Sequence, residues 1–314
     1  MATVEDFTQE WLSDSTVIKA HTSGSTGKPK DILLNKADMR ASARATNSYF
    51  GIEASSVLAS PLSVDYIAGK MMVVRACEAG CRLIELPVSN EIKIPCGIDR
   101  IDLLPIVPSQ INSLLEQAHL SGVIRNVLIG GAPPSAEDCH RLTLAGYKAF
   151  ISYGMTETCS HVALARADEP RRIFHAMPGV SFDVDPDNRL IINASGFTFK
   201  SLLTNDVVTL LSPTAMEWRG RADGIINTGG LKLLPEELET LYSEVLSGRE
   251  YYVKGVDDRQ WGTAVALVIV ARESETEELK MRLRSSIAEH RLLPKYIIAV
   301  DNLPRTSNGK IKRH

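Results

Sequence analysis

Residues 22 to 30 read Thr22-Ser23-Gly24-Ser25-Thr26-Gly27-Lys28-Pro29-Lys30 and directly follow a short apolar stretch, Val17 to Ala20. Glycine lets a backbone approach an anion and turn its amide groups toward it, hydroxyls add further donors, and lysines add positive charge. This segment therefore predicts a loop that binds the phosphates of a nucleotide. A flexible linker uses the same residue types and is the alternative.

The loop differs from the most common phosphate-binding pattern, G-x-x-x-x-G-K-[ST]. That pattern requires glycine where Thr22 stands and a hydroxyl residue where Pro29 stands. Kinase-like and GTPase-like sites are therefore disfavoured.

The composition is typical of a globular protein with about two domains: 314 residues, 44% hydrophobic and 23% charged. A net charge of −3 gives no general basic surface for nucleic acid or an anionic membrane, so we expect neither partner. Five cysteines without a C-x-x-C pair argue against a disulfide framework or a zinc site and predict a cytoplasmic protein. The acidic N-terminus does not resemble a secretory signal, and no apolar run approaches the length of about 20 residues that spans a bilayer.

Apolar runs alternate with longer periodic segments between residues 16 and 208, which predicts an α/β fold with a mainly parallel sheet and packed helices. The segment 67–79 is apolar at helical spacing and ends before Gly80, which predicts a helix with a left-handed cap. A further helix is expected after Pro108. The clearest strand candidates are 57–59, 83–86, 104–107 and 127–129.

The character of the chain changes near residue 220, where two glycines and three charged residues lie within 218–224. We expect a large N-terminal domain, 1–221, a hinge near Asp223, and a smaller α+β domain, 222–314. In the small domain, Pro235 marks a helix start, and 264–270 reads as a buried strand.

Five separated segments resemble, in family order, the adenylate-forming superfamily of acyl-CoA synthetases, adenylation domains and luciferases, which are AMP-binding enzymes. They are the loop 22–30, Ser-Tyr-Gly-Met-Thr-Glu-Thr at 152–158, Gly-Arg-Ala-Asp-Gly-Ile-Ile at 220–226, Gly-Gly-Leu-Lys at 229–232 and Leu-Pro-Arg-Thr-Ser-Asn-Gly-Lys-Ile at 303–311. The resemblance implies a large domain, a mobile small domain, and a reaction in which a carboxylate attacks the α-phosphate of ATP to give an acyl-adenylate and pyrophosphate. Such a transfer depends on charge neutralisation and alignment.

The resemblance implies a role for each matching residue. Glu157 would hold Mg²⁺, Thr156 would contact the α-phosphate, and Tyr153 with Gly154 would offer a face to adenine. The β- and γ-phosphates would lie among Thr22, Ser23, Gly24, Ser25, Thr26, Gly27 and Lys28. The wall of the adenine and acyl pocket would be Gly131, Ala132 and Pro133.

Asp206 stands where the family places the aspartate that holds the ribose hydroxyls, although Asn205 replaces the glycine of the usual Thr-Gly-Asp run. Arg221 matches an arginine that reaches ribose or phosphate. Lys310 matches the lysine that bridges the carboxylate and the α-phosphate, where a compact cation meets developing negative charge.

After adenylation, rotation about Asp223 would withdraw Lys310 and bring a second set of residues to the site. Gly229, Gly230 and Lys232 would then form the channel for the thiol of coenzyme A.

The chain resembles, within this family, the 2-succinylbenzoate-CoA ligases of menaquinone biosynthesis, because it is short and Ser160-His161 follow the 152–158 run. With only 21 residues before the loop, we expect a reduced N-terminal subdomain. Tyr66 would gate the acyl pocket. A second substrate carboxylate needs a cation or several donors, and Lys70, Arg75 and His161 are open candidates.

Three other functions stay open from the sequence: a different acyl- or aryl-CoA ligase, a stand-alone adenylation domain that loads a carrier protein, and a non-catalytic nucleotide- or acyl-binding regulator. Retention of Glu157 and Lys310 argues against the last. A shortened large domain would expose apolar surface, and we expect a homodimer to cover it.

Overall fold

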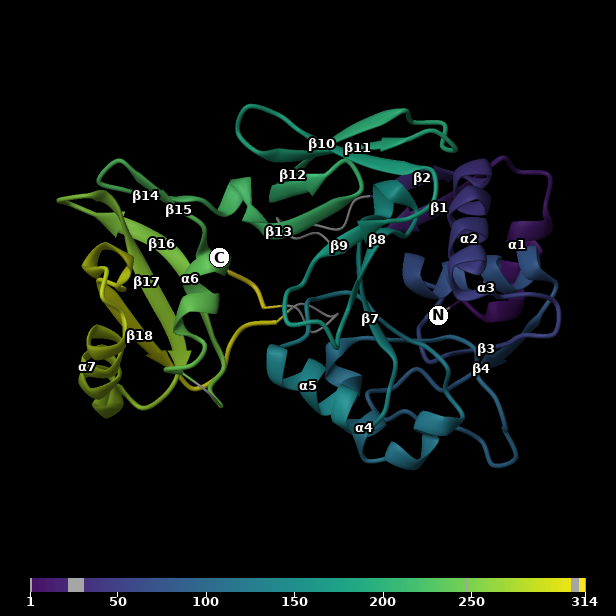
Figure 1. The fold of residues 1–314 in the computed structure, drawn as a ribbon, viewed down its shortest axis with the longest axis horizontal. Coiled ribbons are helices and arrows are strands. Elements are labelled where there is room, and N and C mark those ends of the chain that lie inside the picture. The colour runs from purple at the N-terminus through teal and green to yellow at the C-terminus, as the bar shows by residue number, and fades with distance from the viewer. Residues whose placement is uncertain (1, 22–30, 247, 306–310, 314) are drawn as a thin grey trace. The chain divides into compact units, whose positions relative to one another are not determined.

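The computed structural model describes residues 2–21, 31–246, 248–305 and 311–313, and Figure 1 shows the order of their elements. The chain forms two compact units. One comprises Met1–Asp183, Ile191–Leu202 and Leu210–Glu217, and the other comprises Val184–Leu190, Leu203–Thr209 and Trp218–His314. The functional division after residue 221 stays our proposal.

Three helices and a hairpin form one core of the first unit. They are α1 (Val4–Leu12), β1 (Val17–His21), β2 (Asp31–Asn35), α2 (Lys36–Phe50) and α3 (Ile67–Ala79). Thr3 caps α1 and Asn35 caps α2 through their side-chain oxygens. The predicted helix at 67–79 is confirmed as α3, and Gly80 ends it with a φ of 63°.

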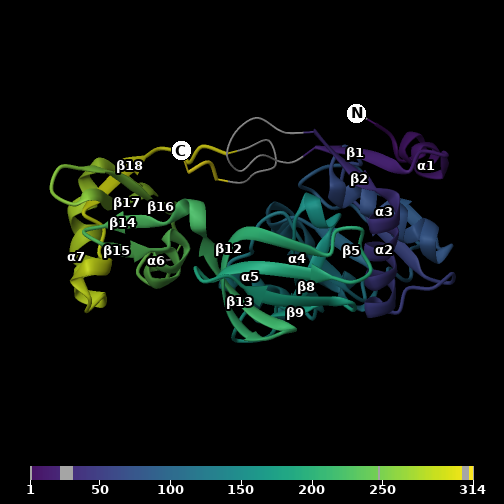
Figure 2. The same cartoon turned by 90° about the horizontal axis from the view of Figure 1, so that it is seen from above.

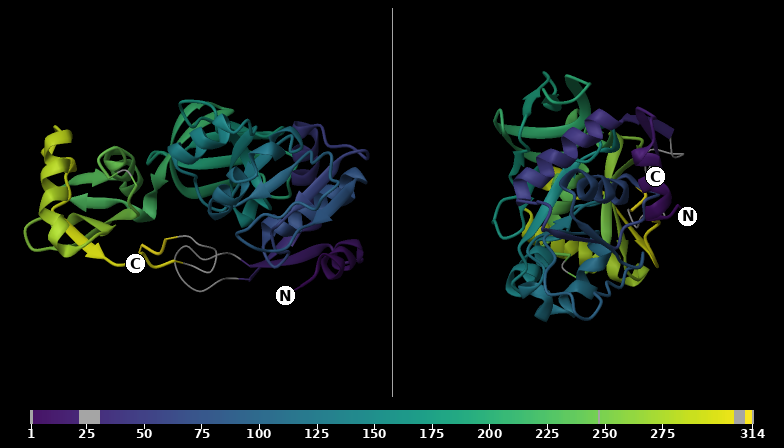
Figure 3. Two further views of the ribbon diagram at one scale, coloured as in Figure 1. Left: turned by 90° about the horizontal axis from the view of Figure 1, so that it is seen from below. Right: turned by 90° about the vertical axis from the view of Figure 1, so that its right-hand side faces the viewer.

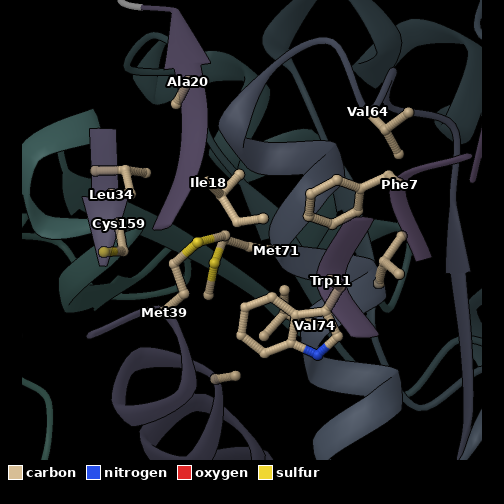
Figure 4. Packing of buried hydrophobic residues seen from close by; sticks show 12 residues of the cluster. Phe7, Trp11, Ile18, Ala20, Leu34, Met39, Val64, Met71, Val74 and Cys159 are labelled. Atoms are coloured by element: carbon tan, nitrogen blue, oxygen red, sulfur yellow. The ribbon is translucent and has the colours of Figure 1, made fainter. Parts of the chain in front are cut away.

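The cluster between these elements is fully apolar apart from one thiol. In Figure 4, Met39 and Met71 lie side by side near Ile18 and Trp11, and Cys159 enters from a distant part of the chain. All five side chains are buried. The cluster therefore joins α1, α2 and α3 to the loop at residue 159.

A buried lysine caps the C-terminal end of α1. Lys36 Nζ donates to the carbonyl oxygens of Glu10, Trp11 and Ser13 at 2.9, 2.8 and 2.8 Å. The last carbonyls of a helix have no partner within it, and a cation is favourable there. Lys36 thus fixes the start of α2 to the end of α1.

The principal sheet has nine strands in the order β10-β11-β12-β13-β9-β8-β7-β6-β5. β5, β6 and β7 pair in parallel, whereas β8 pairs antiparallel with β7, and β9 with β8. The bounds are β5 (Leu104–Ile106), β6 (Val127–Ile129), β7 (Ala149–Gly154), β8 (His161–Arg166), β9 (Phe174–Ala176), β10 (Val180–Val184), β11 (Arg189–Ala194), β12 (Ser201–Ser212) and β13 (Ala215–Arg221). The division between the two units passes through β10 to β13.

Helical segments connect the parallel strands, as expected for crossover connections. Between β5 and β6 lie η1 (Pro108–Gln110), α4 (Ile111–Leu115) and η2 (Ala118–Gly122), and α5 (Ala136–Leu144) joins β6 to β7. A separate parallel pair, β3 (Val57–Ser60) and β4 (Arg82–Glu85), is joined by α3. The α/β class and all four leading strand candidates are confirmed. The principal sheet is mixed rather than mainly parallel, because β8, β9 and β13 join it by antiparallel pairing.

The second unit contains a five-stranded sheet in the order β15-β14-β17-β16, with β18 pairing β17 in parallel. Its elements are η4 (Ala222–Gly224), β14 (Ile226–Thr228), β15 (Leu231–Leu233), α6 (Pro235–Tyr242), β16 (Tyr251–Asp258), β17 (Gly262–Val270), η5 (Glu273–Glu275), α7 (Thr276–Ser286), η6 (His290–Leu292) and β18 (Tyr296–Val300). Figures 2 and 3 show this sheet and its two helices from other sides.

Both helices of the second unit use the same face of the sheet. Leu238 of α6 and Leu283 of α7 share a core with Leu267 of β17. The opposite face carries a smaller cluster that contains Val268 and Leu303. Leu303 and Ile311, which follow β18 in the sequence, therefore pack on the back of the sheet. In the described part of the chain, no helix has both the length and the apolar character to cross a membrane.

Replacing Met71 by alanine should lower the free energy of unfolding by about 2–5 kcal/mol, because a large apolar side chain is removed from a closed core. Urea denaturation followed by circular dichroism measures the loss. Met281→Ala is the matched control, since Met281 is 63% exposed, and a change within about 0.5 kcal/mol is expected there. Equal losses in the two variants would contradict this packing.

Candidate functional site

The candidate site begins at one edge of the parallel strands. β5, β6 and β7 run in register, with Ile106, Ile129 and Ile151 as partners, so their carboxyl ends meet. In α/β sheets, such an edge is the usual place for a ligand. Ser152 Oγ donates to the carbonyl oxygen of Ile129 at 2.9 Å, and Gly130 leaves room for that hydroxyl. The strand ends are therefore fixed close together.

A close backbone approach requires glycine at position 154. The pairing of β7 with β8 shifts between Tyr153 and Gly154, and β8 returns directly against this point. A Cβ atom on Gly154 would lie 2.2 Å from the carbonyl oxygen of Ser160, closer than real Cβ contacts. Only glycine fits the tight return of the chain between Gly154 and His161.

The return loop presents Thr156 and Glu157 on a one-turn helix, η3 (Thr156–Thr158). Buried Thr158 closes the loop, because its hydroxyl lies 2.7 Å from the Ser160 carbonyl oxygen and accepts from the Met155 amide at 3.1 Å. Cys159 follows with a φ of 62°, which is uncommon for a residue with a side chain. The sequence did not indicate these two locking residues.

Glu157 is an exposed carboxylate at this edge. Among the described residues, no group of three or more His, Cys, Asp or Glu side chains could hold a metal ion. The geometry therefore does not fit a metal site built wholly from protein ligands. It fits Mg²⁺, which keeps waters and phosphate oxygens and needs only one or two carboxylates.

Arg75 on α3 is the most deeply buried cation near the return loop, with 2% of its surface exposed. Its Nη2 donates to Ser160 Oγ at 2.7 Å, and its Nη1 lies 3.4 Å from the sulfur of Met72. Within the described ranges, Nε has no hydrogen-bond partner, and no acidic side chain pairs with the guanidinium. Burial alone lowers the pKa of Arg75 to about 10.

His161 lies beside this arginine. Its Nδ1 is 3.3 Å from Ser160 Oγ and its Nε2 is 3.2 Å from Thr46 Oγ1. Burial, and then the charge of Arg75, holds the pKa of His161 well below its ordinary value, so the ring is neutral at pH 7. Buried Thr46, Arg75 and His161 form one polar group with half-buried Ser160, here called the Arg75 cluster.

The other two acyl-pocket candidates lie at or near the start of α3. Tyr66 precedes the helix and is exposed. Lys70 Nζ lies 4.3 Å from the ring centre of Phe7 and 4.0 Å from a carboxylate oxygen of Glu10, so it faces α1. Lys70 is therefore occupied in the contact between α1 and α3.

The predicted ribose residues come together in the second unit. The indole Nε1 of Trp218 donates to Asp206 Oδ1 at 3.0 Å, and Arg221 Nη1 lies 3.9 Å from the same oxygen. Asp206 is 6% exposed. Arg221 also makes two hydrogen bonds to Asp223, at 3.0 and 2.9 Å. The sequence predicted Asp206 and Arg221 but not the indole between them.

The two glycines predicted for the thiol channel form the turn between β14 and β15, with φ values of 56° at Gly229 and 85° at Gly230. The ring of Trp261 covers Gly229, because a Cβ atom there would lie 2.4 Å from Trp261 Cε3. Trp261 is 47% exposed, and Lys232 is exposed on β15. Trp261 therefore lies against a predicted channel residue, although the sequence motif did not contain it.

The predicted pocket wall follows β6. Gly131 has a φ of 85°, Ala132 is half-buried and Pro133 is exposed. Arg172 Nη2 donates to the carbonyl oxygen of Pro134 at 2.8 Å and holds the end of this loop.

Eight predicted site residues lie outside the described residues: Thr22, Ser23, Gly24, Ser25, Thr26, Gly27, Lys28 and Lys310.

Comparison with known families gives two matches. A model described as AMP-binding enzyme matches residues 5–195, and one described as AMP-binding enzyme C-terminal domain matches residues 237–310. Among curated proteins, the chain is similar to a 2-succinylbenzoate–CoA ligase of Enterococcus faecalis, with 26% identity over 99% of this chain and 71% of the relative. A ligase of the same name from Listeria monocytogenes is 25% identical over 98% of this chain and 70% of the relative.

Two solved structures are also similar. An acyl-CoA synthetase (AMP-forming)/AMP-acid ligase II-like protein from Dyadobacter fermentans has 30% identity and a TM-score of 0.65, over 99% of this chain and 91% of the other. The o-succinylbenzoate CoA synthetase of Bacillus subtilis, in complex with its acyl-adenylate intermediate, has a TM-score of 0.80 at 21% identity, over 96% of this chain and 68% of the other. The latter similarity supports the fold alone.

The neutral, buried His161 should make stability fall at acidic pH. Its folded-state pKa is below the unfolded value near 6.5, so below about pH 6.5 the unfolded chain binds a proton that the folded chain does not. The free energy of unfolding should therefore decrease by up to about 1.4 kcal/mol per pH unit in that range. Urea denaturation between pH 7.5 and 5 tests this, and His161→Gln should show a shallower slope. An unchanged slope would contradict the assignment.

Proposed function

The chain belongs to the AMP-binding enzyme family, and we propose that it is an ATP-dependent acid–thiol ligase that acts on 2-succinylbenzoate. It would join the carboxylate to AMP with release of pyrophosphate and then transfer the acyl group to coenzyme A. The curated relatives that bear this activity in their names align along almost the whole chain, which supports the proposal.

The nucleotide would lie at the carboxyl edge of β5 to β7. Tyr153 and Gly154 would take the adenine beside Gly131, and Thr156 would contact the α-phosphate. Mg²⁺ bound through Glu157 would neutralise phosphate charge. The loop residues 22–28 would bind the outer phosphates, and Lys310 would stabilise the charge that develops when the carboxylate attacks.

Asp206 and Arg221 would hold the ribose. Their carboxylate and guanidinium are already close, and Trp218 orients the carboxylate through its indole N–H. A carboxylate accepts from both hydroxyls of a ribose, whereas a backbone turn would present no such pair of oxygens.

The observation that carries the choice of acid is the charge of Arg75, which no acidic side chain pairs with in the part of the chain that the structure describes. 2-Succinylbenzoate has two carboxylates, of which one reacts and the other stays anionic in the pocket. A buried cation without a counter-ion is costly, and a bidentate carboxylate relieves that cost. Among the three open candidates, His161 is neutral and Lys70 faces Glu10, so Arg75 is the group with charge to offer.

In the second step, rotation about Asp223 would withdraw Lys310 and admit the thiol between Gly229, Gly230 and Lys232. Trp261 would form one wall of that channel, since its ring already lies on Gly229. We further propose that the enzyme works in the cytoplasm, where ATP and coenzyme A are available, and that it forms a homodimer.

The direct test supplies ATP, Mg²⁺ and coenzyme A with 2-succinylbenzoate, and in parallel with benzoate, fatty acids and amino acids. Pyrophosphate release and an acyl-CoA product of the correct mass are expected only with 2-succinylbenzoate, and Lys310→Ala should lose pyrophosphate release. Product from another acid would indicate a different acyl-CoA ligase. No release with any acid would contradict the enzymatic proposal.

Arg75→Met should lower kcat/KM for 2-succinylbenzoate by at least about 30-fold, because losing one partner of a buried charge pair costs about 2–5 kcal/mol. The KM for ATP should change little. Arg44→Met is the matched control, since Arg44 is an exposed residue of α2.

A second measurement distinguishes a role of Arg75 in binding the second carboxylate from a role in folding of the pocket. If an aromatic acid without the second carboxylate is turned over slowly, Arg75→Met should not slow that reaction further. Equal losses for both acids would show that Arg75 supports the pocket rather than the second carboxylate.

A further inference from the structure

The chain ends in a charge cluster that the reaction does not explain. Arg313 donates from Nη1 to Glu239 Oε1 at 2.6 Å and from Nη2 to Glu239 Oε2 at 2.9 Å. Its Nη1 also lies 3.7 Å from Glu236 Oε1. Both acids are on α6, so the guanidinium binds two consecutive turns of one helix face. We call these three residues the tail anchor.

The tail anchor is more enclosed than an ordinary surface ion pair. The Glu236 and Glu239 side chains are only 14% and 20% exposed, and burial raises the pKa of both carboxyl groups. Glu239 Oε1 also accepts from the amide of Val253 on β16 at 2.8 Å. Exposed pairs contribute little, but removing one partner of an enclosed, hydrogen-bonded pair leaves an uncompensated charge.

The residues around the anchor are fixed as well. Ile311 forms an antiparallel β-bridge with Arg305. Its side chain packs against the small cluster that contains Val268 and Leu303 on the back of the sheet. The amide of Lys312 donates to the carbonyl oxygen of Pro304 at 2.7 Å. The described residues on either side of 306–310 are therefore held to the second unit by backbone, apolar and ionic contacts.

Lys310 immediately precedes Ile311 in the sequence. We infer that Arg313 is a positioning residue for adenylation: its pairing with Glu239 and Glu236 fixes residues 311–313 on α6 and so sets where Lys310 can present its ammonium group. This inference rests on the proposed function. A lysine has a long, flexible side chain, so its reach depends on where its backbone is held, and a displacement of about 1 Å in a reacting group can cost about 100-fold in rate.

If the tail anchor positions Lys310, breaking the anchor should lower the rate of only one of the two half-reactions. Lys310 acts only in the adenylation step, whereas the thiol step uses Gly229, Gly230 and Lys232, which lie in a different part of the second unit. Arg313→Met should therefore slow adenylation and spare thioester formation. A general loss of folding would slow both steps.

The experiment uses the full chain and measures the two half-reactions separately. Single-turnover pyrophosphate release without coenzyme A reports adenylation, and thioester formation from synthetic acyl-adenylate reports the second step. Arg313→Met should lower the first rate by about 10- to 100-fold, with the KM for ATP unchanged, and leave the second within about 2-fold. Arg313→Lys should recover part of the rate.

Lys312→Met is the matched control, because it removes the same charge one residue earlier from an exposed side chain. It should keep both rates. Glu239→Gln should slow adenylation like Arg313→Met, and combining the two changes should add little, as expected for residues that act as a pair. If Arg313→Met does not fold, Glu239→Gln and Arg313→Lys carry the test.

Equal losses in both half-reactions, or no loss in either, would overturn the positioning role while leaving the proposed function intact. A strong loss in Lys312→Met would also overturn it, because the effect would then follow net charge rather than the anchor. A wild-type chain that releases no pyrophosphate with any acid would overturn the proposed function and this inference together.

Discussion

The position of β7 between β6 and β8 is the constraint on which the candidate site depends. On one side, parallel pairing aligns the ends of β5, β6 and β7. On the other, β8 returns so closely that Gly154 has no space for a side chain. The residues between them must form a tight loop, and Thr158 and Cys159 fix its shape. That loop presents Thr156 and Glu157 at the edge and places Ser160 and His161 beside Arg75.

Two buried cations, Lys36 and Arg75, and the partly exposed Arg313 show different ways in which the fold compensates charge. Lys36 is surrounded by the carbonyl oxygens at the end of α1, and Arg313 by two carboxylates of α6. Among the described residues, the guanidinium of Arg75 contacts one hydroxyl and one sulfur, which is little for a group with five N–H donors. The charges of Lys36 and Arg313 are thus compensated by groups of the protein itself. Arg75 differs from both, because its Nε has no hydrogen-bond partner within the described residues, and this contrast is the support for the proposed acid.

Hydrophobic periodicity was sufficient to predict α3, β3 to β6 and the α/β class, because these elements are short, strongly apolar and bounded by turn residues. The order of five motifs was sufficient for the family. Periodicity could not choose among Lys70, Arg75 and His161, since the choice depends on α1 packing against α3 and on the return of β8. Nor could a motif reveal Trp261, which reaches Gly229 only through the pairing of β14 with β17. The assigned roles of the site residues stay predictions.

The construction of the Arg75 cluster has a consequence for how such a protein can diversify. Its members come from α2, α3 and the start of β8 with the residue before it. The proposed nucleotide residues belong to other segments: the loop 22–28, the ends of β6 and β7 with η3, and the second unit. If Arg75 binds the second carboxylate as proposed, a substitution at Arg75 or Thr46 would change the contacts to the acid, and neither residue belongs to the strand ends. The nucleotide-binding residues can therefore stay unchanged while the preference for the acid changes. Relatives that share one nucleotide site can come to prefer different carboxylate substrates through few mutations.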